Sequence, residues 1–188
     1  EMCIRDRAGD VIVADKADAL LLAKIKAGAK VLLVPKEIKD SERMTFANPF
    51  WSTLLFDYQP KTMGLLCNPK HDALKQFPTD SYTDWQWWDL NINSTTLITD
   101  NLKGGDAIVE MIDNFANNRK LASLYEGQVG NGKLMLATFD LERNLDKRPV
   151  AKQMLISILD YMNSDKFNPS VLSNFDVLKD LSLIHISE

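Results

Sequence analysis

The chain has 188 residues, of which 45% are hydrophobic and 26% are charged, and its net charge is −4. This composition is typical of a globular domain and excludes a disordered or fibrous chain. No apolar run approaches the roughly 18 to 20 residues that a membrane span needs. No basic cluster is longer than residues 118–120, so the charge footprint of phosphate-backbone binding is missing. We therefore expect no membrane span and no nucleic acid partner.

The two ends of the chain have the pattern of a translated sequencing tag. Residues 181–188 back-translate to CTG TCT CTT ATA CAC ATC TCC GAG, which resembles the transposase end sequence used to tag DNA. The reverse complement, read in another frame, encodes residues 1–6 and begins the codon of Arg7. One oligonucleotide explains both ends, so we interpret residues 1–7 and 181–188 as artefactual tags. We expect the natural protein to be longer at both ends.

Outside the tags, Cys67 and His71 are the only cysteine and the only histidine. One residue of each type cannot form an intrachain disulfide or a Cys/His zinc site. The glycines match no nucleotide-binding motif, and we expect no metal and no cofactor. Cys67 lacks the small flanking residues of a nucleophile elbow, so packing is its expected role, with a thiol nucleophile as the alternative. His71 is interpreted as a loop histidine that bonds to backbone.

The first half of the chain predicts a β-α-β unit. Residues 11–14 form a short apolar run that predicts a strand, and a helix with an acidic start follows and ends before Gly28. The apolar run 31–34 predicts a second strand, parallel to the first. A loop-like stretch follows over residues 36–61, and it holds a cluster of aromatic residues: Phe46, Phe50, Trp51, Phe56 and Tyr58.

The rest of the domain alternates strands with turn-rich segments. We expect strands at 63–67 and 107–112, and a hairpin of 121–126 with 134–139 whose turn contains Gly130-Asn131-Gly132. Pro149 opens an amphipathic closing helix. Residues 8–163 are expected to form a single α/β domain, and 164–180 a polar tail or linker.

The most unusual local feature is the run Asp84-Trp85-Gln86-Trp87-Trp88-Asp89. Indole faces can stack on the C–H faces of sugars, and neighbouring carboxylates can accept hydrogen bonds from sugar hydroxyls. In the alternative, the rings are buried and pin an irregular loop to the sheet. We expect Trp85 or Trp87 to be structural and Trp88, next to Asp89, to be the exposed ring. The candidate substrate-binding residues are Trp85, Trp87, Trp88, Asp84 and Asp89, and no residue is a candidate catalyst.

Several segments together resemble the C-terminal region of bacterial glycoside hydrolase family 2 proteins of the β-galactosidase type. The segments that carry the resemblance are Met63-Gly64-Leu65-Leu66, Asn68-Pro69-Lys70-His71, Phe77-Pro78-Thr79, residues 84–90, Ile112-Asp113-Asn114-Phe115, residues 126–134 and Arg148-Pro149. The resemblance implies a degenerate class I glutamine-amidotransferase-like α/β domain. Its fold would be three-layered (flavodoxin-like), with a mostly parallel sheet flanked by helices, a C-terminal β-hairpin and a closing helix.

The resemblance also implies a function for the chain as part of a larger glycan-degrading enzyme. The family's acid/base glutamate follows an asparagine in a separate barrel, and no Asn-Glu dipeptide occurs here, so no catalytic role carries over. We expect a non-catalytic accessory domain whose partners are the parent enzyme's glycan, the catalytic barrel or a second copy of the chain. A carbohydrate-binding module that uses residues 85–88 and a thiol hydrolase that uses Cys67 are the alternatives. The resemblance implies a periplasmic or secreted location.

Overall fold

The structure is a computed structural model, and it describes residues 8–36, 38–39, 41–47, 55–56 and 60–174. Both expected tags lie outside the described residues. The same holds for residues 175–180 of the expected tail and for Phe50, Trp51 and Tyr58 of the aromatic loop.

The chain begins with the expected β-α-β unit, made of β1 (Val11–Ala14), α2 (Ala19–Lys26) and β2 (Lys30–Leu33). The side chain of Asp18 caps α2, where its Oδ1 accepts a hydrogen bond from the Leu21 amide at 2.7 Å. Strands β1 and β2 pair in parallel, as predicted.

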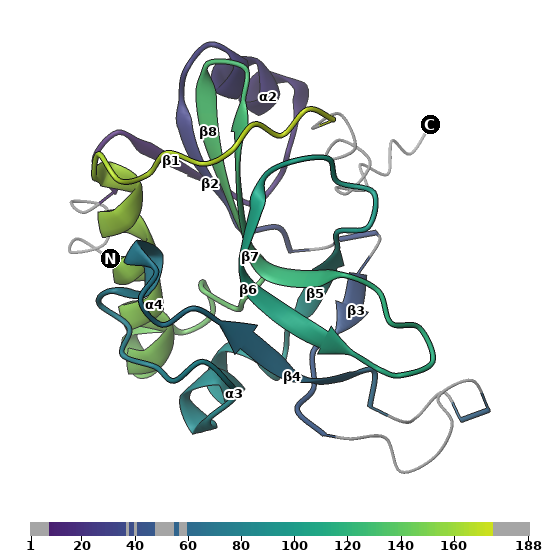
Figure 1. Ribbon diagram of the computed structural model, residues 1–188. Coiled ribbons are helices and arrows are strands. Elements are labelled where there is room, and N and C mark those ends of the chain that lie inside the picture. The colour runs from purple at the N-terminus through teal and green to yellow at the C-terminus, as the bar shows by residue number, and fades with distance from the viewer. Residues whose placement is uncertain (1–7, 37, 40, 48–54, 57–59, 175–188) are drawn as a thin grey trace, which may run out of the picture.

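The remaining strands complete a mixed sheet of eight strands (Figure 1). They are β3 (Ser41–Arg43), β4 (Thr62–Cys67), β5 (Thr95–Ile98), β6 (Asp106–Asp113), β7 (Leu121–Val129) and β8 (Gly132–Ala137). One edge of β7 pairs with β6, and its other edge pairs with β8 and with β5. Strand β4 lies beyond β6, and β2 lies beyond β8.

The expected mostly parallel sheet is wrong. The pairs β1–β2 and β2–β8 are parallel, whereas the five other strand pairs of the described residues are antiparallel. The hairpin of β7 and β8 is one reason, because its two-residue turn at Gly130 and Asn131 can only join antiparallel strands. Gly130 has a φ of 60°, which suits glycine in such a turn. The chain thus has a mixed α/β fold with a sheet core, and the hairpin itself was predicted correctly.

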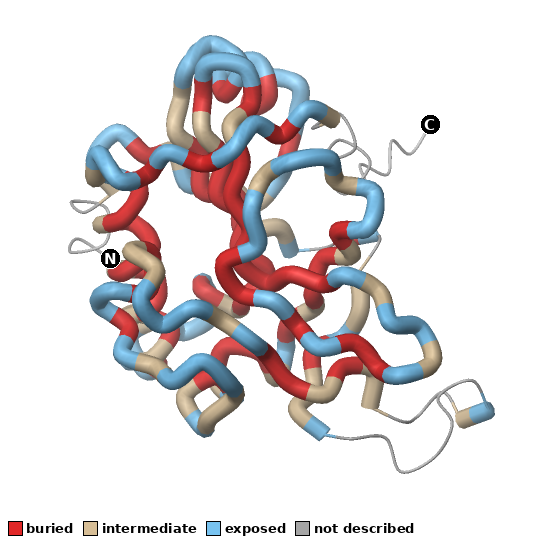
Figure 2. Tube along the Cα trace, viewed as in Figure 1, coloured by how far each residue is buried: buried red, intermediate tan, exposed pale blue. Residues whose placement is uncertain are grey.

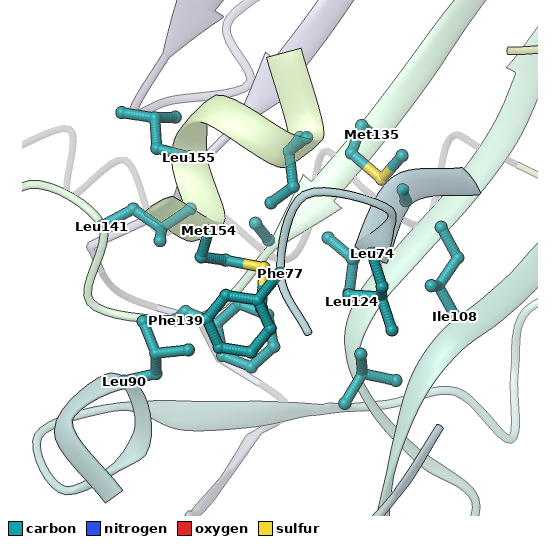
Figure 3. Packing of buried hydrophobic residues seen from close by; sticks show 14 of the residues in the cluster. Leu74, Phe77, Leu90, Ile108, Leu124, Met135, Phe139, Leu141, Met154 and Leu155 are labelled. Carbon is teal, nitrogen blue, oxygen red and sulfur yellow. The ribbon is translucent and has the colours of Figure 1, made fainter. Parts of the chain in front are cut away.

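Helices cover both faces of the sheet. The second and third helices are α3 (Trp85–Asn91) and α4 (Pro149–Asn163), and the single-turn 3-10 helices are η1 (Asp72–Leu74) and η2 (Leu145–Lys147). Buried apolar side chains of α3 and α4 belong to the larger hydrophobic cluster, part of which Figure 3 shows, and those of α2 belong to the second cluster. The closing helix α4 confirms the expectation from Pro149. Within the described residues, no helix has the length and apolarity that a bilayer crossing requires.

The segment after α4 differs from the expected polar tail over its described part, residues 164–174. Phe167 and Leu172 are almost completely buried, and the tube in Figure 2 is red at such positions. Gln128 of β7 donates its amide hydrogen to Ser170 O and accepts one from the Leu172 amide, at 2.8 and 2.9 Å. Two apolar side chains and these backbone bonds hold the segment against the sheet, although most of its residues are polar.

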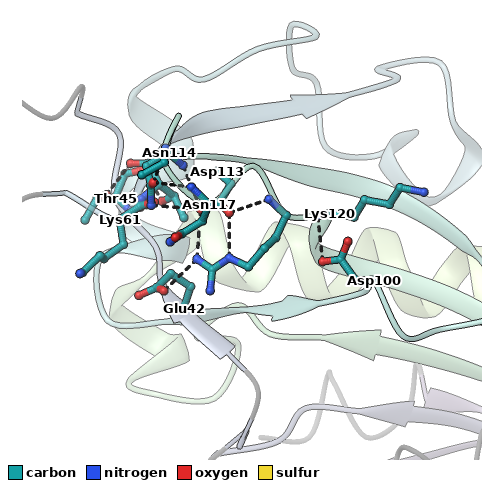
Figure 4. A network of polar contacts seen from close by, with 11 residues as sticks. Glu42, Thr45, Lys61, Asp100, Asp113, Asn114, Asn117 and Lys120 are labelled. Carbon is teal, nitrogen blue, oxygen red and sulfur yellow. Dashed lines mark hydrogen bonds and ion pairs between the residues drawn. The ribbon is translucent and has the colours of Figure 1, made fainter. Parts of the chain in front are cut away.

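A polar network lies at the end of the sheet where β6 ends and β7 begins, away from Gln128 (Figure 4). The Nε of Arg119 donates to Asp113 at 2.8 Å, and its Nη2 donates to Glu42 at 2.9 Å. Burial alone would raise the pKa of Asp113, but hydrogen bonds from Arg119 and from the Asn114 amide lower it below the usual value. The network ties β3, β6 and the loop after β6 together.

Candidate functional site

The tryptophan run forms a short helix, α3, that begins at Trp85. Asp84 caps the helix, because its Oδ1 accepts a hydrogen bond from the Gln86 amide at 3.0 Å. The Gln86 side chain donates to Pro78 O at 2.8 Å and holds the preceding loop against the helix. Residues three apart share one face of a helix, so Trp85 and Trp88 lie together, while Trp87 points to another face.

Trp87 belongs to the hydrophobic core. Its side chain has no exposed area, and its ring lies 5.1 Å from Phe77 and 5.7 Å from Phe139. The indole N–H donates to Thr79 Oγ1 at 2.8 Å, which satisfies its single polar group. We expected Trp85 or Trp87 to be structural, and the burial of Trp87 fits that role, because no part of its ring reaches solvent.

Trp85 and Trp88 form an exposed aromatic surface. Trp85 is 86% exposed and Trp88 is 43% exposed, and their ring centroids are 6.4 Å apart. The other side of Trp88 meets Phe46 edge to face at 6.1 Å. These three rings, together with Thr83 and Asp84, line a cavity of about 400 Å³ that we name the aromatic pocket. Trp85 is therefore more exposed than Trp88, the reverse of the expected order.

The two candidate carboxylates, Asp84 and Asp89, lie in different surroundings. Asp84 lines the aromatic pocket, whereas Asp89 forms a two-oxygen ion pair with Arg148 Nε at 3.0 Å. Arg148 is almost completely buried, and its Nη2 also donates to Asp89 O at 2.7 Å. Asp89 thus joins the end of α3 to the start of α4. It does not line the aromatic pocket, and its ion pair with Arg148 supports a structural role.

Cys67 and His71 do not form a catalytic pair. Burial, assisted by the charge of Asp84, raises the pKa of the Cys67 thiol to about 11, so the thiol is protonated at neutral pH. Its sulfur lies 3.3 Å from Asp80 O. His71 accepts a hydrogen bond from the Ala73 amide through Nδ1 at 3.2 Å, and its ring packs on Tyr161. This geometry supports the packing role expected for Cys67 and does not support a thiol hydrolase.

A second cavity lies at the carboxyl ends of the parallel strands β2 and β8. It has a volume of about 270 Å³, and sequence reasoning missed it. Three of its charged side chains form ion pairs: Arg143 contacts Asp140 at 2.7 Å, and Lys36 contacts Asp15 at 2.9 Å. The sequence did hold a signal for this cavity, namely polar residues directly after two apolar strand runs. Ligands of α/β proteins often bind at the carboxyl ends of such strands. The internal ion pairs make this cavity the weaker candidate.

No group of histidine, cysteine and carboxylate side chains suited to a metal ion is found in the part of the chain that the structure describes. The described residues that line the aromatic pocket offer two indole rings, a phenyl ring, a hydroxyl and one carboxylate.

Comparison with known proteins gives a family but no activity. Residues 12–182 match the profile of DUF8487, a domain of unknown function, and the chain belongs to that family. No curated protein shows significant sequence similarity to it. A solved structure, the cytoplasmic protein STM3548 from Salmonella typhimurium, is similar with a TM-score of 0.42 and 13% identity, over 84% of this chain and 74% of that chain. A similarity this distant carries no inference about ligand or activity.

One expectation finds no support in this comparison. The neighbour is described as a cytoplasmic protein, whereas the sequence resemblance implied a periplasmic or secreted location for this chain. That location is withdrawn, and none is assigned in its place.

Proposed function

We propose that this chain is a non-catalytic accessory domain of a larger glycan-degrading enzyme and that its aromatic pocket binds a sugar of the glycan. The observation that carries the proposal is the exposure of Trp85, at 86%, on a helix that Asp84 caps. Tryptophan is usually well buried, because leaving an indole in water forgoes a large hydrophobic gain. An exposed indole beside a second, partly exposed indole forms an apolar patch, which supports a binding surface.

The composition of the aromatic pocket favours a sugar over other small ligands. A sugar ring has an apolar face of C–H groups that packs on an indole plane, and hydroxyl groups at its rim that need acceptors. Trp85 and Trp88 supply the planes, and the Asp84 carboxylate supplies acceptor oxygens. Among the described residues that line the pocket, none carries a positive charge, which disfavours a phosphate or carboxylate ligand.

The same residues argue against glycoside hydrolysis by this chain. Hydrolysis needs two carboxyl groups on opposite sides of the bond, roughly 5 to 10 Å apart. Asp84 is the single carboxylate among the described residues that line the pocket, and Asp89 is held in its ion pair with Arg148. The supporting argument for a larger parent enzyme is the sequence resemblance to glycoside hydrolase family 2 proteins.

Titration of the 188-residue chain with glycans tests the proposal. A glycan array identifies the ligand, and calorimetry compares the wild type with Trp85→Ala and Phe115→Ala. Phe115 is 66% exposed and does not line the aromatic pocket, so it is the matched control for loss of an exposed ring. We expect Trp85→Ala to weaken binding at least tenfold, which corresponds to about 1.4 kcal/mol, and Phe115→Ala to leave it unchanged. Equal losses in both variants, or no glycan binding by the wild type, would refute the proposal.

A further inference from the structure

We infer that the glycan-binding surface continues from the aromatic pocket along the edge of β4 to Tyr82 and Leu66, so that its ligand is a neutral oligosaccharide longer than one sugar unit. This inference rests on the proposed function and adds the length and charge class of the ligand.

Residues 81–83 run beside β4 as an irregular edge strand. The Cys67 amide donates to Ser81 O at 3.0 Å, and the Leu65 amide donates to Thr83 Oγ1 at 2.9 Å. Between these bonds, Leu66 and Tyr82 form an antiparallel bridge. The backbone therefore fixes both side chains, and both are exposed, Tyr82 at 58% and Leu66 at 48%.

Gly64 allows this segment to lie close to β4. A Cβ added at Gly64 would come within 2.8 Å of Thr83 Oγ1, which is closer than real Cβ atoms approach a neighbour. The missing side chain thus leaves room for Thr83, and Thr83 itself lines the aromatic pocket. One continuous stretch of chain joins the Tyr82 edge to the pocket.

The distance along this stretch suits an oligosaccharide. Tyr82 and Trp85 are three positions apart in the sequence, so their Cα atoms lie at most about 11 Å from each other. This is of the order of two linked sugar rings, so a chain stacked on Trp85 can reach Tyr82. Aromatic rings tolerate many sugar stereochemistries, because they contact C–H faces and not individual hydroxyls. The Tyr82 hydroxyl adds a donor and an acceptor at the rim.

The charges at this edge restrict the ligand further. Asp84 lies in the pocket, Asp80 precedes the edge segment, and Glu110 is the register partner of Leu66 on β6. Acidic side chains at all three places repel anionic ligands such as sulfated glycans and nucleic acids. A neutral oligosaccharide meets no such penalty, and its hydroxyls can donate to these carboxylates.

A length series of ligands tests the inference. The probes are neutral β-galacto-oligosaccharides from the monosaccharide to the hexasaccharide, titrated into the 188-residue chain. For the wild type we expect affinity to rise at least tenfold from the monosaccharide to the hexasaccharide. Tyr82→Ala should remove most of that increase and leave monosaccharide affinity unchanged, whereas Trp85→Ala should weaken binding of both.

Two further variants keep the experiment decisive if Tyr82→Ala disturbs the edge of the sheet. Tyr82→Phe retains the ring and should retain the length dependence, and Phe115→Ala should behave as the wild type. Wild-type affinity that does not rise with length, or a Tyr82→Ala variant with full hexasaccharide affinity, overturns the inference while leaving the Trp85 result to support the proposed function. Failure of the wild type to bind any member of the series overturns both.

Discussion

Two groups of aromatic rings meet at α3, and they are built in nearly the same way. In the core, Phe77 and Trp87 lie edge to face with centroids 5.1 Å apart and planes at 65°. On the surface, Trp85 and Trp88 are 6.4 Å apart with planes at 67°. The difference is in exposure, since Trp87 has no accessible area and Trp85 is 86% exposed.

The comparison teaches that residue type and pair geometry do not separate a packing tryptophan from a binding one. Two features separate them: whether the indole N–H has a hydrogen-bond partner within the protein, and whether other side chains cover the faces of the ring. The Trp87 N–H has a partner in Thr79, and neighbouring rings and the sheet enclose the indole. Trp85 meets Trp88 on one side, and most of its surface stays available to a ligand.

The largest expected loss of stability comes from the buried group of rings, at Trp87. Trp87→Ala should lower the free energy of unfolding by about 3 to 5 kcal/mol, because it removes a fully buried ring and leaves a cavity. Thermal and denaturant unfolding of the variant measure this loss. A variant that unfolds within about 1 kcal/mol of the wild type would mean that the core can close over the missing ring.

A second prediction concerns the polar group beneath α4, on the same buried side. Glu126 accepts a hydrogen bond from Tyr161 at 2.9 Å, and burial raises the pKa of Glu126 to about 7. The Tyr161 bond opposes this rise, whereas the charge of Asp106 adds to it, and Lys133 opposes it as well. The folded state thus holds the proton more tightly than the unfolded state does.

Stability should therefore fall as pH rises from about 4.5, the ordinary pKa of glutamate, to about 7, with a total change of at most about 3 kcal/mol. Glu126→Gln should remove most of this dependence, because an amide does not titrate. The test is chemical denaturation of both proteins at several pH values in this window. Parallel pH profiles for the two proteins would contradict the assignment to Glu126.

The sequence predicted one half of the fold better than the other. The apolar runs of β1 and β2 and the cap at Asp18 have strong local signals, and the hairpin turn at Gly130 is equally clear. Strands β3 and β5 have three and four residues, which is too short to show an alternation of apolar and polar residues in the sequence. The antiparallel pairing of β4 with β6 joins segments far apart in sequence, and no local pattern encodes it.

The candidate site shows the same limit. The run 84–89 pointed to the segment that lines the aromatic pocket, but it predicted neither the helix α3 nor the residue of the run that faces solvent. A seven-residue helix has under two turns, so the spacing of Trp85, Trp87 and Trp88 alone did not specify which face packs on the sheet. Phe46 was visible as an aromatic residue in a loop, and only the fold brings it to Trp88.

Trp88 lies between the two sides of the comparison, and its variant should have an intermediate effect. The ring is 43% exposed and contacts both Phe46 and Trp85. We expect Trp88→Ala to cost about 1 to 2 kcal/mol of stability, because only part of the ring is removed from water. It should also weaken glycan binding, because it removes one wall of the aromatic pocket. A loss as large as that of Trp87→Ala would place Trp88 in the core instead.

The smallest effect on stability belongs to Trp85. Its ring keeps most of its surface in water, so Trp85→Ala forgoes little burial, and the cap at Asp84 does not depend on the Trp85 side chain. Alanine also has a higher helix propensity than tryptophan, which offsets part of the lost contact with Trp88. We expect a change under about 0.5 kcal/mol in denaturant unfolding, with the direction open to either sign. Since the same substitution is expected to weaken glycan binding at least tenfold, Trp85 should be the position where stability and binding separate most. A loss above about 2 kcal/mol would show that the ring packs in solution, and the exposed half of the comparison would then have no binding residue.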